Sequence, residues 1–299
     1  MAFGRILEVK LGSDPLSNSA LLISDLNMEV EVDRSIYYDK GGTCELTVYN
    51  ATPNMREACC RQGAGIEVRI GYGDELGGTT GAIFIGNVLE GYSSLTSGTW
   101  VTKMRASSSR PVGQALETTV VSVSYRAGSQ LRAVLRDVAV ALGLKLDTAK
   151  MPDIPLPNGY AEATTSAVVV KHLRDILVSN GYGLYMDNNE MLVYQAGVVG
   201  DYQVTTLNAD SGLLKVSKVE SAASRRRAIM ARKSKKKPDT SNVMGLVEFS
   251  CLALPELQPN AVVGLRASAF SGKCLLESVK FKLDNRGDAW IAECTGLYL

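Results

Sequence analysis

Four stretches between residues 44 and 105 alternate between apolar and polar side chains. They cover 44–49, 66–70, 83–88 and 100–105, with turns or a short helical segment between them. Successive side chains of a strand point to opposite faces of a sheet, so each stretch predicts a strand with one buried face. Consecutive strands of this kind predict an antiparallel barrel or sandwich.

The middle of the chain changes to a helical period. Apolar side chains recur at i, i+3, i+4 and i+7 over 131–142, and a similar pattern covers 169–177. This spacing predicts two amphipathic helices. We expect Ser129 and Ser166 as their N-caps, because a serine oxygen accepts a hydrogen bond from a free N–H of the first turn. Gly143 is the expected stop of the first helix.

Each predicted helix is followed by a short strand. Residues 144–146 follow the first helix, and 183–186 follow the second after a stop at 180–181. Asn188-Asn189 predicts a tight turn into a strand at 191–194. This segment therefore predicts two helix-strand units.

The period switches twice, from two to 3.6 near Pro111 and back near Tyr202. We interpret the switches as domain boundaries of a β-rich α+β protein. We expect a first β-domain at 1–110, a small α+β domain with two helix-strand units at 111–198, and a second β-domain at 199–299. Within the last domain, alternating residues at 247–251 and a hairpin closed by a turn at 285–288 predict strands.

A run of positive charge without any acid lies between residues 225 and 237. The net charge of the chain is +1, so removing these eight charges leaves −7 for the rest. Because adjacent like charges repel and a Lys-Pro step does not suit a central strand, we expect a long loop at 221–242 that interrupts the second β-domain. The loop is open to three interpretations: a solvated excursion, contact with nucleic-acid phosphates, or docking to an acidic protein. The candidate contact residues are Arg225, Arg226, Arg227, Arg232, Lys233, Lys235, Lys236 and Lys237.

The sequence offers little catalytic chemistry. His172 is the only histidine, and it lies in the second predicted helix away from any nucleophile motif, so we assign it a structural or surface role. The glycine-rich segment 71–81 lacks the Gly-Lys-Ser/Thr ending of a phosphate-binding loop and predicts a hairpin loop instead. The six cysteines show no CxxC spacing, which favours free, buried thiols over zinc ligands. We expect no catalytic residue, no metal and no cofactor.

No apolar run reaches the roughly 18 residues of a membrane span, and residues 1–6 lack the apolar stretch of a secretory signal. We therefore expect a protein that is made in the cytoplasm and does not contact a membrane.

Several segments, taken in their order along the chain, resemble one family. In the first part they are Val48-Tyr49-Asn50 before Thr52-Pro53, then 65–72, 83–88 and 100–102; in the middle they are 173–177, 181–184 and 191–194; at the end they are 272–279 and 287–290. This succession resembles the baseplate hub proteins of bacteriophages, which include the late-control hub proteins of contractile tails and the hub part of type VI secretion spikes.

The resemblance implies a non-enzymatic virion protein with two tail-tube-like β-barrel or sandwich domains per subunit. It implies a homotrimer that joins the tail tube to the central spike and forms part of the channel for DNA ejection. The implied partners are the tail tube protein, the central spike protein, the tape measure protein, the baseplate wedge proteins and, transiently, DNA in the channel. The expected location is the phage tail baseplate, assembled in the host bacterial cytoplasm. The sequence ends at Leu299 without a needle or lytic domain, so we expect a separate spike protein to supply the tip.

Two other classes of function stay open. One is a cell-wall hydrolase of a phage tail tip, which would use some of the 31 acidic residues, although no pair of them stands out. The other is a nucleic-acid-binding module acting through residues 225–237. No aromatic residue interleaves these charges, which disfavours stacking on single strands.

Overall fold

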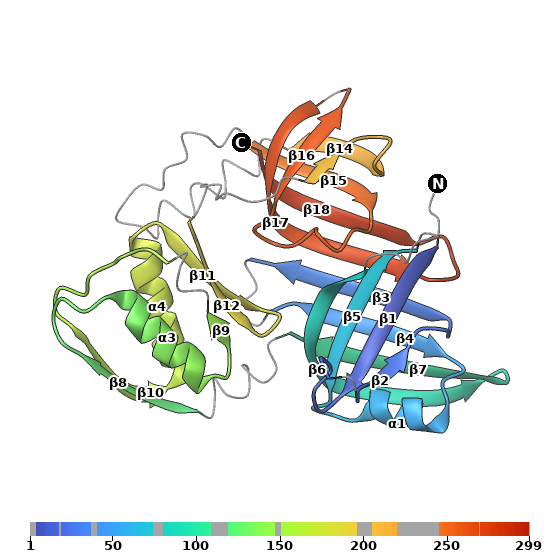
Figure 1. The fold of residues 1–299 in the computed structure, drawn as a ribbon, viewed down its shortest axis with the longest axis horizontal. Coiled ribbons are helices and arrows are strands. Elements are labelled where there is room, and N and C mark those ends of the chain that lie inside the picture. The colour runs from blue at the N-terminus through green and yellow to red at the C-terminus, as the bar shows by residue number, and fades with distance from the viewer. Residues whose placement is uncertain are drawn as a thin grey trace.

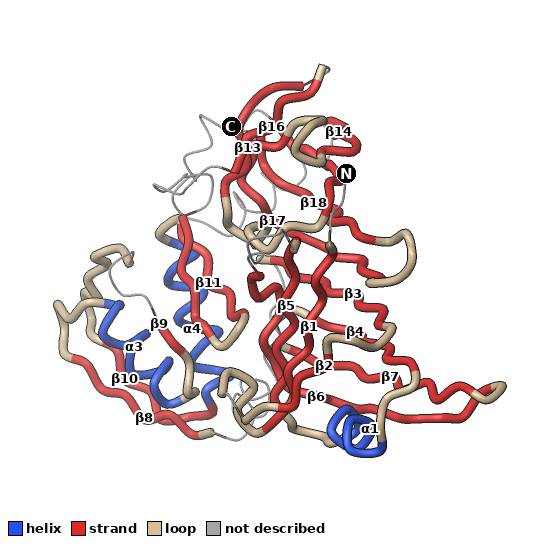
Figure 2. The backbone as a smooth tube through the Cα atoms, turned by 45° about the vertical axis from the view of Figure 1, so that its right-hand side comes forward, coloured by secondary structure: helices blue, strands red, loops and turns tan. Residues whose placement is uncertain are grey.

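The computed structural model describes residues 4–17, 19–36, 41–73, 80–108, 119–146, 151–195, 205–219, 245–268 and 270–298. Figure 1 shows a large body of strands beside a smaller green and yellow body that contains the helices α3 (Leu131–Ala141) and α4 (Ser166–Ser179). Figure 2 shows the same arrangement from a second direction, with a further short helix at the foot of the large body. None of the described helices combines the length and apolarity that a membrane span requires.

The large body is built from the two ends of the chain. Its N-terminal half contains β1 (Arg5–Gly12), β2 (Leu21–Ile23), β3 (Met28–Ser35), β4 (Thr43–Tyr49), α1 (Pro53–Cys60), β5 (Gly65–Tyr72), β6 (Thr80–Thr96) and β7 (Thr99–Ser107). Its C-terminal half contains β13 (Thr205–Leu207), β14 (Leu213–Val219), β15 (Gly245–Leu252), β16 (Val262–Ala267), β17 (Phe270–Asp284) and β18 (Trp290–Tyr298).

The small body comes from the middle of the chain. It contains β8 (Val120–Tyr125), α3 (Leu131–Ala141), β9 (Lys145–Leu146), β10 (Tyr160–Thr165), α4 (Ser166–Ser179), β11 (Tyr182–Asp187) and β12 (Glu190–Gln195). β8 pairs with β10, and β11, β12 and β9 form a second small sheet in which β9 runs parallel to β12. A hydrophobic cluster of its own holds this body together, separate from the cluster of the large body.

The alternation predicted for the strands is confirmed by their burial. In β4, Cys44, Leu46 and Val48 are at most 1% exposed, whereas Glu45 between them is exposed. The closing hairpin of β17 and β18 is also confirmed, with buried side chains at every second position from Val279 to Leu283 and from Trp290 to Cys294. The buried residues of both halves form one contiguous cluster, so the two ends of the chain share a core.

Thirteen of the described strands belong to one sheet, ordered β14-β15-β18-β17-β3-β4-β7-β6-β5-β1-β2, with β16 and β13 extending from β17. All neighbours in it are antiparallel except β13 and β16. The path begins at β14 and ends at β2, so the described strands close no barrel. The expected β-rich, antiparallel architecture is confirmed, but of the expected barrel or sandwich the barrel is not formed by the described strands: β3 and β17 join the two halves edge to edge into one open sheet.

The two halves repeat one strand order. The first half reads β3-β4-β7-β6-β5 across the sheet, and the second reads β14-β15-β18-β17-β16. Each set of five contains a long hairpin, β6–β7 in the first half and β17–β18 in the second. The second strand of the hairpin pairs with an earlier strand of its half, β7 with β4 and β18 with β15. Every pairing within these two sets is antiparallel.

A β-bulge lies at the same point of both hairpins. The register of β6 against β7 shifts between Val88 and Glu90, and that of β17 against β18 shifts between Leu276 and Ser278. A bulge adds one residue to a strand and increases its local twist. Since Glu90 and Ser278 follow equivalent bulges, they give an alignment of the two halves residue by residue.

Both helices of the small body begin one residue away from the expected cap. Gln130, not Ser129, is the N-cap of α3, because a bridge between Gln130 and Pro155 keeps the chain extended up to the helix. Thr165, not Ser166, is the N-cap of α4, because Thr165 still belongs to β10. Neither cap makes a side-chain hydrogen bond.

The expected stops and turn are confirmed. Gly143 and Gly181, which follow α3 and α4, have positive φ angles of 69° and 86° that favour glycine. Asn188 and Asn189 have φ angles of 49° and 63° and join β11 to β12 in a two-residue turn.

Candidate functional site

One face of the large sheet is charged and crosses both halves. Its side chains alternate with core residues on eight adjacent strands, from β14 to β6. The register places Lys280 beside Asp33, and Lys282 beside Glu31, across the joint between the halves. We call this surface the charged face and define it by thirteen half-buried or exposed residues: Glu29, Glu31, Asp33, Glu45, Glu90, Lys103, Arg105, Lys215, Glu248, Lys280, Lys282, Asp284 and Glu293.

Opposite charges pair between neighbouring strands of this face. Lys280 Nζ lies 2.5 Å from Glu31 Oε1, and Lys282 Nζ lies 2.8 Å from Glu293 Oε1. The hydrogen bond that Lys280 donates to Glu31 raises the pKa of Lys280. Exposed pairs of this kind contribute about 0–1 kcal/mol each. The core beneath the face, rather than its ion pairs, therefore holds the sheet together.

Acids outnumber bases on the charged face by eight to five. Glu31 and Glu45 even lie directly opposite each other on β3 and β4, an arrangement that destabilises a sheet. A surface that keeps like charges side by side is explained better by its electrostatic potential than by its contribution to folding.

Two open grooves lie on the charged face at equivalent points of the halves. One has a volume of about 430 Å³ and is lined by β4, β6 and β7, including Glu45 and Arg105. The other has about 510 Å³ and is lined chiefly by β15, β17 and β18, including Glu248 and Thr295. Glu45 pairs with Arg105 as Glu248 does with Thr295. Both grooves are lined by charged side chains of both signs.

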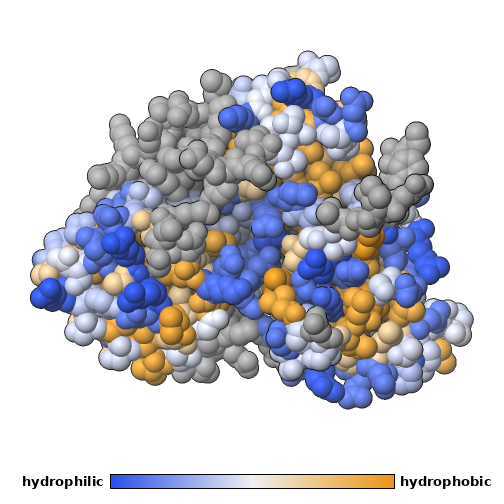
Figure 3. Space-filling model, viewed as in Figure 1, coloured by the Kyte–Doolittle hydropathy of each residue, from blue (hydrophilic) through white to orange (hydrophobic). Residues whose placement is uncertain are grey.

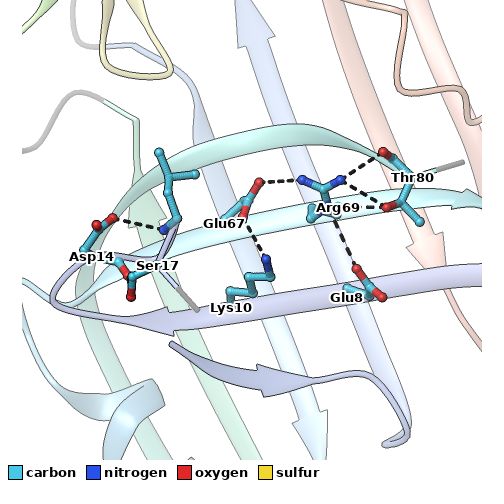
Figure 4. A network of polar contacts seen from close by, with 8 residues as sticks. Glu8, Lys10, Asp14, Ser17, Glu67, Arg69 and Thr80 are labelled. Carbon is cyan, nitrogen blue, oxygen red and sulfur yellow. Dashed lines mark hydrogen bonds and ion pairs between the residues drawn. The ribbon is translucent and has the colours of Figure 1, made fainter. Parts of the chain in front are cut away.

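A denser polar network lies on β1 and β5 (Figure 4). Glu67 is only 2% exposed, with Arg69 Nη1 at 3.0 Å and Lys10 Nζ at 3.9 Å from its carboxylate. Arg69 also lies 3.9 Å from Glu8 and donates hydrogen bonds to Thr80. A buried carboxylate is tolerated when cations and hydrogen bonds compensate its lost hydration.

Polar contacts fix the small body against the large sheet. Arg34 Nη2 lies 2.6 Å from Asp187 Oδ2, and Arg34 Nε donates to the same oxygen at 2.7 Å. Arg34 Nη1 donates to the carbonyl of Ile83 at 2.9 Å, while Asn188 Oδ1 accepts from the N–H of Ile85 at 2.9 Å. Hydrophilic residues also gather at the centre of the surface in Figure 3, between the two bodies.

The sequence analysis did not predict the contact between Arg34 and Asp187. The one indication of it lies in β3, where Arg34 occupies the same buried phase as Val30 and Val32. A charged residue on a buried phase indicates a partner from elsewhere in the chain. The sequence does not tell which acid that partner is.

The predicted contact residues 225–237 lie outside the described residues, as do residues 74–79 of the glycine-rich segment. His172 lies on α4, half exposed, and its Nδ1 contacts the carboxylate of Glu162 on β10. The surface position expected for His172 is thus confirmed.

The cysteines are free, as expected, and five of the six are buried; Cys60 is half-buried. Burial raises the pKa of the thiols of Cys59 and Cys274 to about 12. Within the described ranges, no group of three or more His, Cys, Asp or Glu side chains is arranged to hold a metal ion.

No protein-family model matches the sequence, and no curated protein matches it. Solved structures do match. A tail protein from Neisseria meningitidis aligns over 99% of this chain and 97% of its own, with a TM-score of 0.66 and 12% identity. The 43 kDa tail protein of prophage MuSo2 from Shewanella oneidensis aligns over 98% of both chains, with a TM-score of 0.62 and 12% identity.

A component of the type VI secretion system from E. coli, described as structurally similar to the T4 bacteriophage tail proteins gp27 and gp5, is also similar. It aligns over 92% of this chain and 74% of its own, with a TM-score of 0.53 and 10% identity. The fold of this chain is therefore one shared by phage tail proteins. The resemblance to hub proteins is confirmed at the level of the fold.

Proposed function

We propose that this protein is the structural hub of a phage tail baseplate, which joins the tail tube to the central spike. The observation that carries the proposal is the repeat of five strands within one sheet. Three copies of a chain with two equivalent halves present six similar surfaces around a threefold axis. Such an assembly can meet a sixfold tube on one side and a threefold spike on the other, and closed symmetry of this kind is usual for oligomers.

The charged face is the proposed wall of the channel for the tape measure protein and DNA. Its surplus of acids repels the phosphate backbone. Weak attraction between wall and cargo would let DNA slide during ejection, whereas a basic wall would hold it through counterion release.

The proposed domain division is the one that the periodicity of the sequence predicts. Residues 1–110 and 199–299 are the tube-like domains, and 111–198 form the domain between them. The separate core of the small body supports this division. The contact between Arg34 and Asp187 would hold the small domain beside the tube-like parts, where baseplate wedge proteins would approach.

The basic residues 225–237 are the proposed contact for an acidic partner protein or for DNA. Their charge is opposite to the net −7 of the remaining chain. They would give this virion protein a second, positively charged surface distinct from the charged face.

Electron microscopy of the purified protein, alone and mixed with its tail tube protein, tests the proposal. The expected result is a ring of threefold symmetry that caps one end of the tube. A monomer that does not bind the tube would contradict it. Zymography with purified peptidoglycan separates the hub from a cell-wall hydrolase, since a clear lytic band from the pure protein contradicts a purely structural role.

A further inference from the structure

The same Leu-Trp pair occurs in both halves of the sheet, but only one copy of it is buried. Aligning the halves at their bulges sets Leu95 against Leu283, because each lies five residues after the first residue beyond the bulge, Glu90 or Ser278. Leu95 pairs with Trp100 across β6 and β7, as Leu283 pairs with Trp290 across β17 and β18. Leu283 and Trp290 are 2% and 0% exposed, whereas Leu95 and Trp100 are 58% and 36% exposed.

The buried pair owes its cover to the other half of the chain. Val30 of β3 pairs with Leu283 at the joint between the halves. Arg5 of β1 lies over the Trp290 ring at 5.5 Å, and Tyr72 of β5 packs against it edge to face at 6.3 Å between centroids. The N-terminal half thus supplies both a paired strand, β3, and the side chains of β1 and β5 that cover the Trp290 ring.

The exposed pair has no such cover in the described residues. β5 pairs with β6 only as far as Asn87, so the same edge of β6 continues beyond it without a strand beside residues 90–96. Only Arg56 of α1 stacks on Trp100, at 3.8 Å from the ring centroid. Figure 2 shows this hairpin of β6 and β7 projecting past α1.

The strand that would fit this edge is present at the other end of the sheet. β14 holds the position in the second half that β3 holds in the first, and among the described strands it pairs with β15 alone. Val216 is the equivalent of Val30, because these two residues pair with the equivalent positions Phe249 and Leu46. Unpaired edges of strands are templates for pairing with another chain.

We infer that β14 of one copy pairs antiparallel with residues 90–96 of β6 in the next copy, and that this joint reproduces the one between β3 and β17. Val216 of one copy lies beside Leu95 of its neighbour, and the Leu95–Trp100 pair becomes buried. Each chain offers one edge of each kind, so the contact is head to tail. The number of copies rests on the proposed hub function, but the pairing itself does not.

A disulfide across the inferred joint tests its register. The double variant Leu95→Cys, Val216→Cys is prepared in a Cys60→Ser background, which removes the half-buried native thiol. Under a mild oxidant, the double variant should give covalent dimers and trimers on a non-reducing gel. Each single variant should stay monomeric on the same gel, because one position cannot meet itself in a head-to-tail contact.

A substitution at the exposed pair tests the energetics. Leu95→Asp should weaken self-association by about tenfold or more, the order of magnitude expected for loss of one buried leucine. Tyr92→Asp is the matched control, since Tyr92 is 60% exposed on the opposite side of the same strand; it should associate like the wild type. Circular dichroism and thermal unfolding confirm that each variant folds.

Several outcomes overturn the inference. One is a wild type that stays monomeric at high micromolar concentration. Another is a wild type that assembles although the double cysteine variant forms no disulfide and Leu95→Asp assembles normally. Threefold rings without the disulfide would remove this joint and leave the hub proposal intact. Disulfide-linked open chains instead of trimers would keep the joint and contradict the hub.

Discussion

Arg34 and Asp187 form a buried ion pair that connects the large sheet to the small body. The closest nitrogen and oxygen are 2.6 Å apart, and both side chains are at most 5% exposed. The two residues are 153 positions apart in the sequence, so the pair closes a long loop of chain. Its position makes it the main polar anchor between the two bodies.

Breaking this pair should be costly. Asp187→Ala leaves the Arg34 guanidinium buried without its carboxylate, and we expect a loss of about 3–5 kcal/mol in the free energy of unfolding. The double variant Arg34→Met, Asp187→Leu should recover most of this loss, because a hydrophobic pair needs no hydration. Urea denaturation measures both values.

The exposed pair between Glu57 of α1 and Arg61, the C-cap of that helix, has an N–O distance of 2.9 Å and is the control. Glu57→Ala should cost less than about 0.5 kcal/mol. Equal effects at Asp187 and Glu57 would show that the buried pair does not anchor the small body.

The two tryptophans should respond differently to assembly. Trp290 is fully buried and Trp100 partly exposed, and the chain contains no other tryptophan. In the variant Trp290→Phe, all tryptophan emission comes from Trp100, and we expect a blue shift as concentration rises and the ring forms. In Trp100→Phe the emission of Trp290 should stay constant. A Trp100 spectrum that does not change on assembly argues against its burial by a second copy.

The buried thiols should make the protein less stable at alkaline pH. Burial raises the pKa of Cys59 and Cys274 from 9.0 to about 12 in the folded state. At a pH above the pKa of the unfolded thiols, the unfolded chain releases these two protons, whereas the folded chain keeps them. The stabilisation is therefore complete below about pH 9 and is lost as the pH rises towards 12.

Chemical denaturation at pH 8 and pH 10 measures this loss. The variant Cys59→Ala, Cys274→Ala should show a smaller fall between the two pH values than the wild type. Tyrosine ionisation affects both proteins alike and cancels in the comparison. An equal fall in both would mean that these thiols do not contribute to the pH dependence.

Deleting residues 225–237 should spare folding and impair tail assembly or genome ejection. The run carries eight positive charges and no acid, and a run of like charges is a poor contributor to a hydrophobic core. Thermal unfolding of the purified variant and infectivity of phage that carry it are the two measurements. Normal infectivity would make the run a solvated excursion only.

Local features of this fold could be predicted from the sequence. Alternation located β4, and helical spacing located α3 and α4. The turn at Asn188-Asn189 was predictable because asparagine tolerates the positive φ angles that such turns require. Each of these features depends on residues that are close together in the sequence.

Long-range features could not be predicted. The choice of β17 as partner for β3 joins residues near opposite ends of the chain, and alternation does not specify a partner strand. For the same reason the alternation of the strands did not distinguish a barrel or sandwich from one open sheet. The predicted N-caps of α3 and α4 were each wrong by one residue. The bridge to Pro155 keeps Gln130 extended, and Thr165 is the last residue of β10. Of the residues at the candidate site, only Arg34 could be recognised from the sequence, because it is a charged residue at a position of β3 where the alternation predicts a buried side chain.

The number of copies in the assembled particle tests the hub most directly. Light scattering coupled to gel filtration gives the mass of the particle, and class averages from electron microscopy give its symmetry. The account predicts three copies in a closed ring whose rim shows six similar lobes. A stable monomer, a dimer or an open filament as the species that binds the tail tube would contradict it.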